Sequence, residues 1–204
     1  MKKKPVLTLV CGVPRVGKST WIKSHKANNV VISSDEIRKE FFGHQFHAPA
    51  NQFVFGIAEN MTNLLLKQGK NVIIDATNVT IGARASWRII ASKNEAKVKV
   101  VWVYSSKDNC QNLIDILERN YYSPKSEQVP DAILFRMMVG FMVPEAISEG
   151  NWFEVEEYHS KHGRKLPPDK RIKIDKDDDL YNVFEKWRLL WDVDAGKTNN
   201  SKVK

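Results

Sequence analysis

The chain alternates between short, continuously apolar runs and longer segments in which apolar residues recur every three or four positions. A continuous apolar run is typical of a strand buried on both faces of a sheet, and the longer spacing is typical of an amphipathic helix. The predicted strands cover residues 6–10, 30–32, 71–75, 97–104 and 152–158. The predicted helices cover residues 19–26, 33–42, 51–67, 81–93, 108–119 and 131–141. This alternation predicts an α/β fold: a parallel sheet with right-handed crossovers and helices on both faces.

Residues that start and stop helices support these boundaries. Ser33 and Glu36 are spaced as a capping box, which predicts that a helix begins there. Gly69 is placed to end the helix over 51–67, because glycine readily adopts the left-handed conformation that closes many helices. The apolar positions of that helix include several large side chains: Phe53, Phe55, Ile57, Met61, Leu64 and Leu65.

Past His159 the pattern changes. Residues 1–158 are predicted to form the main domain, and 159–204 are predicted to form an extension of it. Residues 161–171 are rich in basic side chains and contain two adjacent prolines, which is typical of a linker.

One more helix is predicted within the extension, over residues 180–191, which makes it a C-terminal helical extension. It has an apolar stripe: Val183, Phe184, Trp187 and Leu190. The stripe is expected to pack back on the domain, the alternative being a surface for a partner. Residues 195–204 have little apolar surface to bury and are expected to be disordered.

Composition narrows the class of protein. The chain has 204 residues, 42% of them hydrophobic and 27% charged, as in a globular protein. The formal net charge of +8 and the pI of about 9.4 favour anionic partners. Cys11 and Cys110 do not form a CxxC pair and are expected to be core residues of a cytoplasmic protein. The first apolar run ends at Gly12, too short for a membrane span or a signal peptide, so no membrane association is expected.

A phosphate-binding loop (P-loop) follows the first predicted strand. The sequence GVPRVGKS matches G-x-x-x-x-G-K-[ST], with a strand before it and a helix after it. In such a loop the backbone N–H groups cradle phosphates, the lysine reaches the β- and γ-phosphates, and the serine hydroxyl binds Mg²⁺. The residues expected to hold ATP are Gly12, Val13, Pro14, Arg15, Val16, Gly17, Lys18, Ser19 and Thr20, with Ser19 also a metal ligand.

Two further strand ends carry polar residues, and ligands of open α/β sheets bind beyond these carboxyl ends. Asp75 ends a predicted strand and is a candidate for holding Mg²⁺ through water. Two alternatives remain open: Asp75 caps the following turn with Thr77 and Asn78, or it fixes a nearby arginine.

Asp35 and Arg38 lie three positions apart, on one face of the helix after the second strand. The carboxylate suits a base that accepts the proton of an attacking hydroxyl, and the arginine suits an anionic group of the acceptor. The alternative is that Asp35 only complements the helix dipole, with Arg38 as its ion-pair partner.

Arg119 ends the helix that precedes the irregular segment 120–130. At the hinge of a lid, an arginine could clamp a transferring phosphoryl group. It could equally be a cation that complements the helix dipole.

Taken in order, several segments resemble the P-loop kinase family that contains the kinase domain of phage polynucleotide kinase. They are GVPRVGKSTW, SSDEIRKEFFG, VIIDATNVT followed by AR, LERN followed by VP, and VPEAISEGNWFEV. The resemblance implies a P-loop NTPase/kinase fold, ATP and Mg²⁺ as cofactors, and transfer of the γ-phosphate to the 5′-hydroxyl of DNA or RNA.

The resemblance also implies roles for individual residues. Lys18 and Ser19 correspond to the P-loop pair, and Asp75 corresponds to the acidic residue of the second motif. Asp35 corresponds to the general base, and Arg38 to the contact with a substrate phosphate. Catalytic residues are therefore expected to be Lys18, Asp35 and Arg119, the last as the first arginine of the lid and a contact for ATP.

The lid departs from the family pattern, which has a second arginine in Arg-Asn-x-x-Arg. Ser123 stands at that place, with Lys125 nearby. Lysine supplies charge but no bidentate fork, so the missing group could come from Arg15 or Arg136 instead.

The sequence leaves three functions open. The preferred one is a kinase that acts on 5′-hydroxyl ends of polynucleotides. The second is a small-molecule or nucleotide kinase of the same fold, and the third is a nucleotide-gated binding module with slow ATP hydrolysis. The oligomeric state, the donor base and the choice between DNA and RNA are also left open.

Overall fold

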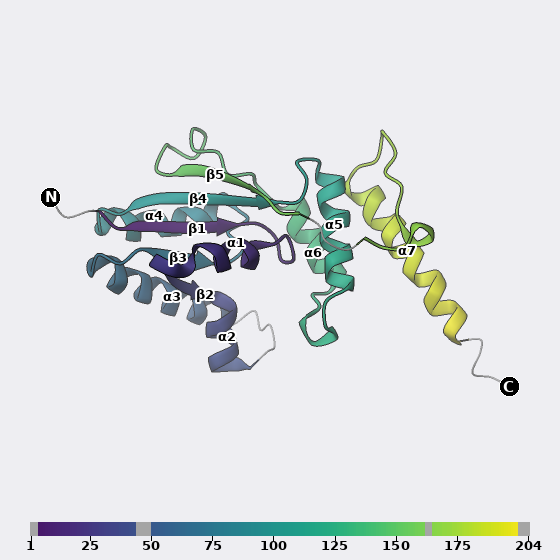
Figure 1. The fold of residues 1–204 in the computed structure, drawn as a ribbon, viewed down its shortest axis with the longest axis horizontal. Helices are drawn as coiled ribbons and strands as arrows, with labels where there is room; N and C mark the ends of the chain where they lie inside the picture. The colour runs from purple at the N-terminus through teal and green to yellow at the C-terminus, as the bar shows by residue number, and fades with distance from the viewer. Residues whose placement is uncertain (1–3, 44–49, 162–164, 200–204) are drawn as a thin grey trace.

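The computed structural model describes residues 4–43, 50–161 and 165–199. Its centre is a five-stranded sheet in which all neighbouring strands are parallel, in the order β2-β3-β1-β4-β5 (Figure 1). The strands are β1 (Val6–Cys11), β2 (Val30–Ser33), β3 (Val72–Asp75), β4 (Lys97–Tyr104) and β5 (Glu154–His159). Each one overlaps a predicted strand, so the predicted parallel α/β fold is confirmed.

Helices connect the strands and lie close to their predicted bounds. They are α1 (Lys18–His25), α2 (Ser34–Phe42), α3 (Ala50–Lys67), α4 (Ile81–Lys93), α5 (Asn109–Tyr121), α6 (Asp131–Val139) and α7 (Leu180–Asn199). Single 3-10 turns are η1 (Lys26–Asn28), η2 (Lys125–Glu127) and η3 (Pro168–Lys170). The predicted cap of α2 is confirmed, since the Ser33 hydroxyl accepts a hydrogen bond from the Glu36 backbone N–H at 3.4 Å.

The core lies on both faces of the sheet, which explains why the strands are continuously apolar. On one face Val10, Val101 and Val103 pack with residues of α1 and α5. On the other face Leu7 and Leu9 pack with residues of α3 and α4. Figure 1 shows that the carboxyl ends of the strands point toward α5 and α6.

Helix α3 buries a stripe of mostly small side chains rather than its largest ones. The buried residues recur every four positions: Ala50, Val54, Ala58, Thr62 and Leu66. Phe53, Met61 and Leu64 are each exposed by 43% or more. The small side chains on this face allow the helix to pack closely against its neighbours. The helix therefore has more apolar residues than the core buries, and the larger ones remain at the surface.

The C-terminal extension packs against α5 and α6. Val183 and Trp187 of α7 are buried in the same cluster as the core residues of α5, and Phe184 packs against it, so the expected packing is confirmed for these three residues of the stripe. Leu166, within the predicted linker, is also buried there. The helix continues to Asn199, past its predicted end at Trp191, so residues 195–199 are helical where disorder was expected.

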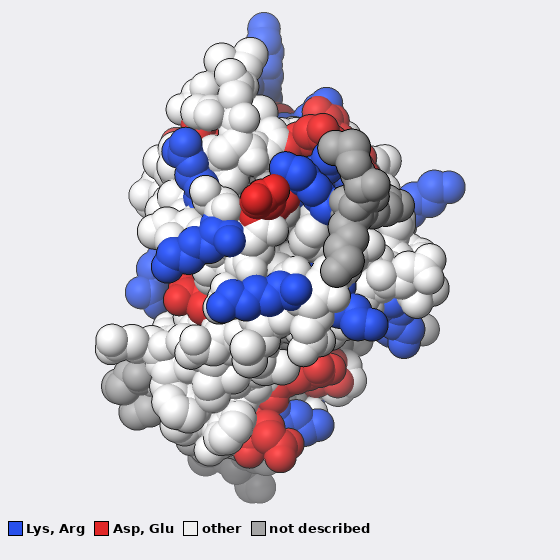
Figure 2. All heavy atoms as spheres, turned by 90° about the vertical axis from the view of Figure 1, so that its left-hand side faces the viewer, with Lys and Arg blue, Asp and Glu red and all other residues white. Residues whose placement is uncertain are grey.

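Residues 200–204 of the expected disordered tail, residues 162–164 of the linker and the turn at 44–49 lie outside the described residues. Among the residues that the structure does describe, no helix is both long enough and apolar enough to cross a lipid bilayer. Figure 2 shows the end of the molecule where the strands begin, and there basic and acidic side chains are interspersed.

Candidate functional site

The P-loop leaves β1 at its carboxyl end, and both of its glycines are required by close packing. A Cβ at Gly12 would lie 2.9 Å from the Val103 carbonyl oxygen, and the Gly12 N–H donates to the Thr77 carbonyl at 2.9 Å. Gly17 has φ +110°, and a Cβ there would lie 2.8 Å from Ser160 Cβ. Larger residues would displace the loop, because Val103 of β4 and Ser160, the residue after β5, leave no room for a side chain.

Lys18 begins α1 and folds its side chain back over the loop, where Nζ donates to the Val13 carbonyl at 3.0 Å. Burial lowers the pKa of Lys18, while the charges of Asp75 and Asp35 act in the opposite direction. Both carboxylates are therefore close enough to interact with the ammonium group. The register of the sheet agrees with this, since Asp75 at the end of β3 lies opposite Ser33 of β2 and Val10 of β1.

Asp75 is half-buried at the end of β3. Burial raises the pKa of its carboxyl group, opposed by the charge of Lys18 and by a hydrogen bond from Ser33. A serine hydroxyl and a carboxylate are ligands that Mg²⁺ accepts, with water and phosphate oxygens completing its shell. Ser19 is exposed at the first turn of α1, so the residues present fit the proposed metal.

Asp35 and Arg38 form an ion pair on α2, with Arg38 Nη1 2.6 Å from Asp35 Oδ1. The two ends differ in exposure: the Asp35 side chain is 90% exposed and that of Arg38 only 11%. Arg38 Nη2 also donates to Asn51 Oδ1 of α3 at 3.2 Å. The arginine is thus fixed by two partners, while the carboxylate remains open to solvent.

Arg119 contacts the P-loop through carbonyl groups. Its Nη1 donates to the carbonyl oxygens of Arg15 and Val16 at 3.2 and 2.6 Å and to the Ser160 hydroxyl at 3.0 Å. Its Nη2 donates to the Ser160 carbonyl at 3.2 Å. Burial lowers the pKa of Arg119, with the charge of Asp115 opposing it. The guanidinium therefore braces the loop and the end of β5, and its contact with a phosphoryl group stays a prediction.

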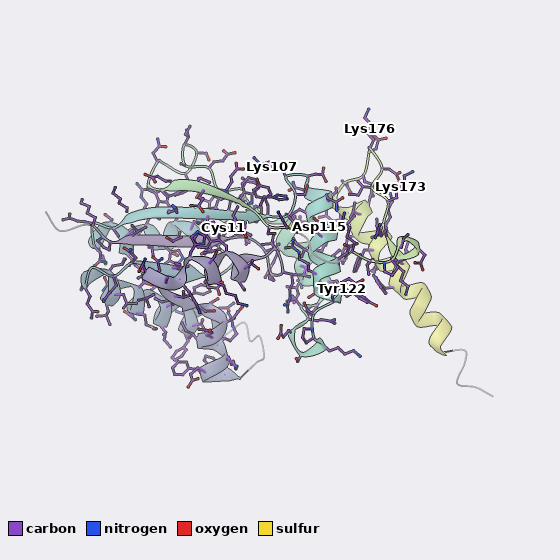
Figure 3. All side chains as sticks on the ribbon, in the orientation of Figure 1. Cys11, Lys107, Asp115, Tyr122, Lys173 and Lys176 are labelled. Carbon is purple, nitrogen blue, oxygen red and sulfur yellow. The ribbon has the colours of Figure 1, made fainter. Side chains whose placement is uncertain are left out.

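Residues 120–130, from the last two residues of α5 to the residue before α6, form the segment that we call the lid. Asn120 closes its base by exchanging hydrogen bonds with both backbone groups of Val129 and by donating to Asp131 at 3.0 Å. Tyr122, the first residue of the lid after α5, lies at the lower end of that helix (Figure 3). The Ser123 hydroxyl donates to the Arg119 carbonyl at 2.9 Å, so it faces the helix.

The other cations considered for the lid lie in different places. Lys125 begins η2 and is exposed. Arg136 lies on α6, where its Nε donates to the Ala132 carbonyl of the same helix at 3.4 Å. Arg15, in contrast, reaches from the P-loop to the lid, where its guanidinium bonds the Glu127 carbonyl and lies 3.6 Å from the Glu127 carboxylate.

Three residues support the site in ways that were not predicted: Asn78 was assigned only to a turn, and Arg84 and Glu149 received no role from the sequence. Asn78 is buried and donates to the Val10 carbonyl at 2.9 Å, which fixes the end of β1. Arg84 is fully buried, pairs with Glu149 at 2.6 Å and donates to the Asn78 carbonyl at 3.0 Å. All three lie in the segments that carry the family resemblance, and that resemblance is the feature of the sequence that could have indicated their importance.

Comparison with known proteins agrees with this architecture. A family model described as an AAA domain matches residues 7–144. A search of curated proteins finds no match to the chain.

Solved structures of low sequence identity share the fold. The chain is similar to a component of the Pnkp1/Rnl/Hen1 RNA repair complex, with a TM-score of 0.58 and 22% identity over 69% of this chain and 45% of that one. It thus spans less than half of that relative's length. Kti12 from Chaetomium thermophilum, in complex with ADP-AlF3, has a TM-score of 0.52 and 17% identity, over 91% and 97% of the two chains.

A sugar kinase from Janibacter sp. HTCC2649 has a TM-score of 0.52 and 11% identity, over 93% and 95% of the two chains. These matches concern the fold, and the match of the family model covers more than half of the sequence. The chain therefore belongs to the AAA domain family and has the α/β fold of a P-loop kinase.

Proposed function

We propose that the protein is an ATP-dependent kinase that transfers the γ-phosphate to the 5′-hydroxyl of a DNA or RNA end. The observation that carries the proposal is the Asp35–Arg38 pair, an exposed carboxylate held beside a fixed guanidinium. The charge of Asp35 also acts on Lys18 of the P-loop. On this proposal Asp35 would accept the proton of the attacking hydroxyl, and Arg38 would bind an anionic group of the acceptor.

The nucleotide is assigned to the P-loop. The backbone N–H groups of residues 12–20 and the Lys18 ammonium would hold the phosphates. Ser19 and Asp75 would hold Mg²⁺, which when bound neutralises charge on the β- and γ-phosphates. Lys18 supplies a second positive charge at the same place, and its interaction with Asp75 helps to keep it protonated despite burial.

The transfer is an in-line displacement. The acceptor oxygen forms a bond to the γ-phosphorus while the bond from that phosphorus to the β–γ bridging oxygen breaks, and ADP leaves. The proton of the hydroxyl passes to the Asp35 carboxylate. Arg38 would orient the acceptor by binding the phosphodiester that follows the 5′ nucleoside.

Two further features support a polynucleotide acceptor. The net charge of +8 favours polyanions, and one structural relative is part of an RNA repair complex. The likeness to a sugar kinase supports the alternative, a kinase of small hydroxyl compounds. Both likenesses are of fold, so the acceptor must be identified by experiment.

The test incubates the full chain with γ-labelled ATP and Mg²⁺, and with either a 5′-hydroxyl oligonucleotide or a set of sugars and nucleosides. We expect label on the oligonucleotide and a KM for it that rises steeply with salt, because phosphate contacts release counterions. Label on a sugar or nucleoside alone would make the protein a small-molecule kinase. ATP binding with no labelled acceptor would favour the binding module.

Asp35→Asn tests the proposed base. We expect the rate of transfer to fall by about 10²–10⁴-fold, the usual contribution of a general base, with ATP affinity unchanged. Glu40→Gln removes another exposed carboxylate from the same helix and is the matched control. Full activity of Asp35→Asn would assign the proton to another group.

A further inference from the structure

Arg15 stands in the P-loop with a backbone conformation that is unfavourable for its residue type. Its φ is +67°, in the left-handed region. For a residue with a Cβ this region costs about 1–2 kcal/mol. Hydrogen bonds from Arg119 to the carbonyls of Arg15 and Val16 hold the backbone in place. A strained residue kept at a binding loop points to a role for its side chain.

The side chain of Arg15 spans the gap between the P-loop and the lid. Its guanidinium bonds the Glu127 backbone carbonyl and lies 3.6 Å from the Glu127 carboxylate. The Arg15 side chain is 24% exposed and that of Glu127 is 62% exposed. An ion pair this open to water contributes about 0–1 kcal/mol, so exchange of Glu127 for a phosphoryl oxygen is energetically easy.

The charge of Arg15 also reaches the phosphate cradle. Together with burial, it lowers the pKa of Lys18, the residue that faces the β- and γ-phosphates in a P-loop. The guanidinium therefore lies between two elements, the P-loop and the segment that we call the lid.

The lid itself offers no arginine. Residues 120–130 contain one cation, Lys125, and the place of a second lid arginine is taken by Ser123, whose hydroxyl faces α5. Arg119 at the hinge is engaged by three carbonyls and a hydroxyl. The lid instead presents an acidic residue, Glu127, that binds the arginine of the loop.

We propose that Arg15 is the catalytic arginine of this kinase, supplied by the P-loop in place of the lid, and that Glu127 of the lid holds it ready. Its fork would bind the γ-phosphoryl oxygens as charge moves onto the leaving bridge oxygen. The inference rests on the proposed function for the transfer, but it is independent of which acceptor is used.

Arg15→Gly is the decisive variant, because glycine accepts the left-handed backbone, so the whole side chain with its guanidinium is removed without new backbone strain. We expect kcat to fall by about 10²–10³-fold or more, with KM for ATP within a few-fold. Arg15→Lys should lose most of the rate as well, since lysine has no fork. A kcat of Arg15→Gly within threefold of the wild-type value would overturn the inference.

A second readout needs no acceptor. The affinity of the protein for ADP with aluminium fluoride and Mg²⁺, a mimic of the transferring phosphoryl group, is compared with its affinity for ADP alone. Arg15→Gly should lose most of the extra affinity for the mimic and keep the affinity for ADP. Equal affinities of the variant and the wild type for the mimic would refute the role of Arg15.

The two readouts separate this inference from the proposed function. Loss of mimic affinity in a protein that labels no oligonucleotide would reject the acceptor and retain Arg15. If Arg15→Gly labels the oligonucleotide as fast as the wild type does, the polynucleotide acceptor is retained and the catalytic role of Arg15 is rejected. Arg88→Ala, which removes an exposed arginine of α4, controls for loss of one charge, and a defect in Arg136→Ala without one in Arg15→Gly would move the role to α6.

Discussion

Cys11 is a residue whose surroundings fix its chemistry. It ends β1 directly before the P-loop, is fully buried, and its thiol donates to the Asn78 carbonyl at 3.1 Å. Burial raises the pKa of the thiol from 9.0 to about 11, although the nearby Arg84 guanidinium opposes the shift. The expectation from sequence that Cys11 and Cys110 are core residues is confirmed, as both are buried.

The raised pKa of Cys11 predicts a loss of stability in alkali. Between pH 9 and 11 the thiol ionises in the unfolded chain and keeps its proton in the folded one, so the free energy of unfolding falls as the pH rises. The slope is at most about 1.4 kcal/mol per pH unit. Denaturant unfolding of wild type and Cys11→Ala, measured across this range, should differ by that slope. Parallel curves would show that the thiol does not contribute.

The partners of single site residues could not be predicted from sequence, even where the residue types were. Arg119 bonds the Arg15 carbonyl across 104 positions, and Arg15 bonds Glu127 across 112. Neither contact belongs to a local pattern with a fixed period. The motif placed Lys18 because its neighbours in sequence are also its neighbours in space, which holds only inside a tight loop.

At the scale of elements, helix ends were predicted well because the responsible groups are local. The Ser33 cap of α2 and the left-handed Gly69 after α3 depend on residues within one turn. The buried face of α3 was not apparent, because its apolar residues occupy more than one face and small residues form the contact. The length of α7 was also underestimated, since its last residues carry no apolar pattern.

The cap of α2 should matter more than other caps. Ser33→Ala is expected to cost about 1 kcal/mol of stability, and it also removes the hydrogen bond to Asp75 and loosens the turn that carries Asp35. The rate of phosphoryl transfer should therefore fall together with the stability.

Thr80→Ala is the matched control for Ser33→Ala, because the Thr80 hydroxyl caps α4 by accepting from the Ala83 N–H at 3.1 Å. It should destabilise the protein by a similar amount in thermal unfolding and leave the rate unchanged. An equal loss of rate in both variants would mean that stability alone, and no local effect at the site, governs activity.

At the scale of the whole molecule, a buried ion pair joins segments that are distant in sequence. Arg84 of α4 is fully buried, pairs with Glu149 at 2.6 Å and donates to the Met142 carbonyl at 3.0 Å. The same guanidinium bonds the turn behind the P-loop through Asn78. The segment before β5 is thereby held to the turn that supports the phosphate site.

Glu149→Gln should destabilise the protein by about 3–5 kcal/mol, because it leaves the Arg84 charge buried and unneutralised. Lys107 and Glu157 form a pair of the same length, 2.6 Å, with side chains that are 61% and 46% exposed. Glu157→Gln should therefore destabilise the protein far less than Glu149→Gln, because water solvates both charges of the exposed pair. Urea unfolding of the two variants compares a buried and an exposed ion pair of equal length. An equal loss of unfolding free energy in both would show that burial does not set the cost.

The base of the lid has a consequence for how the lid can move. Asp131 accepts from Asn120 at one end of the lid and from the Trp187 indole of α7 at 2.9 Å, and Asn120 also holds Val129. The first residue of the lid is thus hydrogen-bonded to residues at its other end, so that the segment forms a loop closed at its base. While these hydrogen bonds hold, we expect the lid to change shape within residues 121–128 rather than to swing as a whole. The C-terminal helix α7 helps to fix the base of the lid, because the Trp187 indole donates to the same carboxylate.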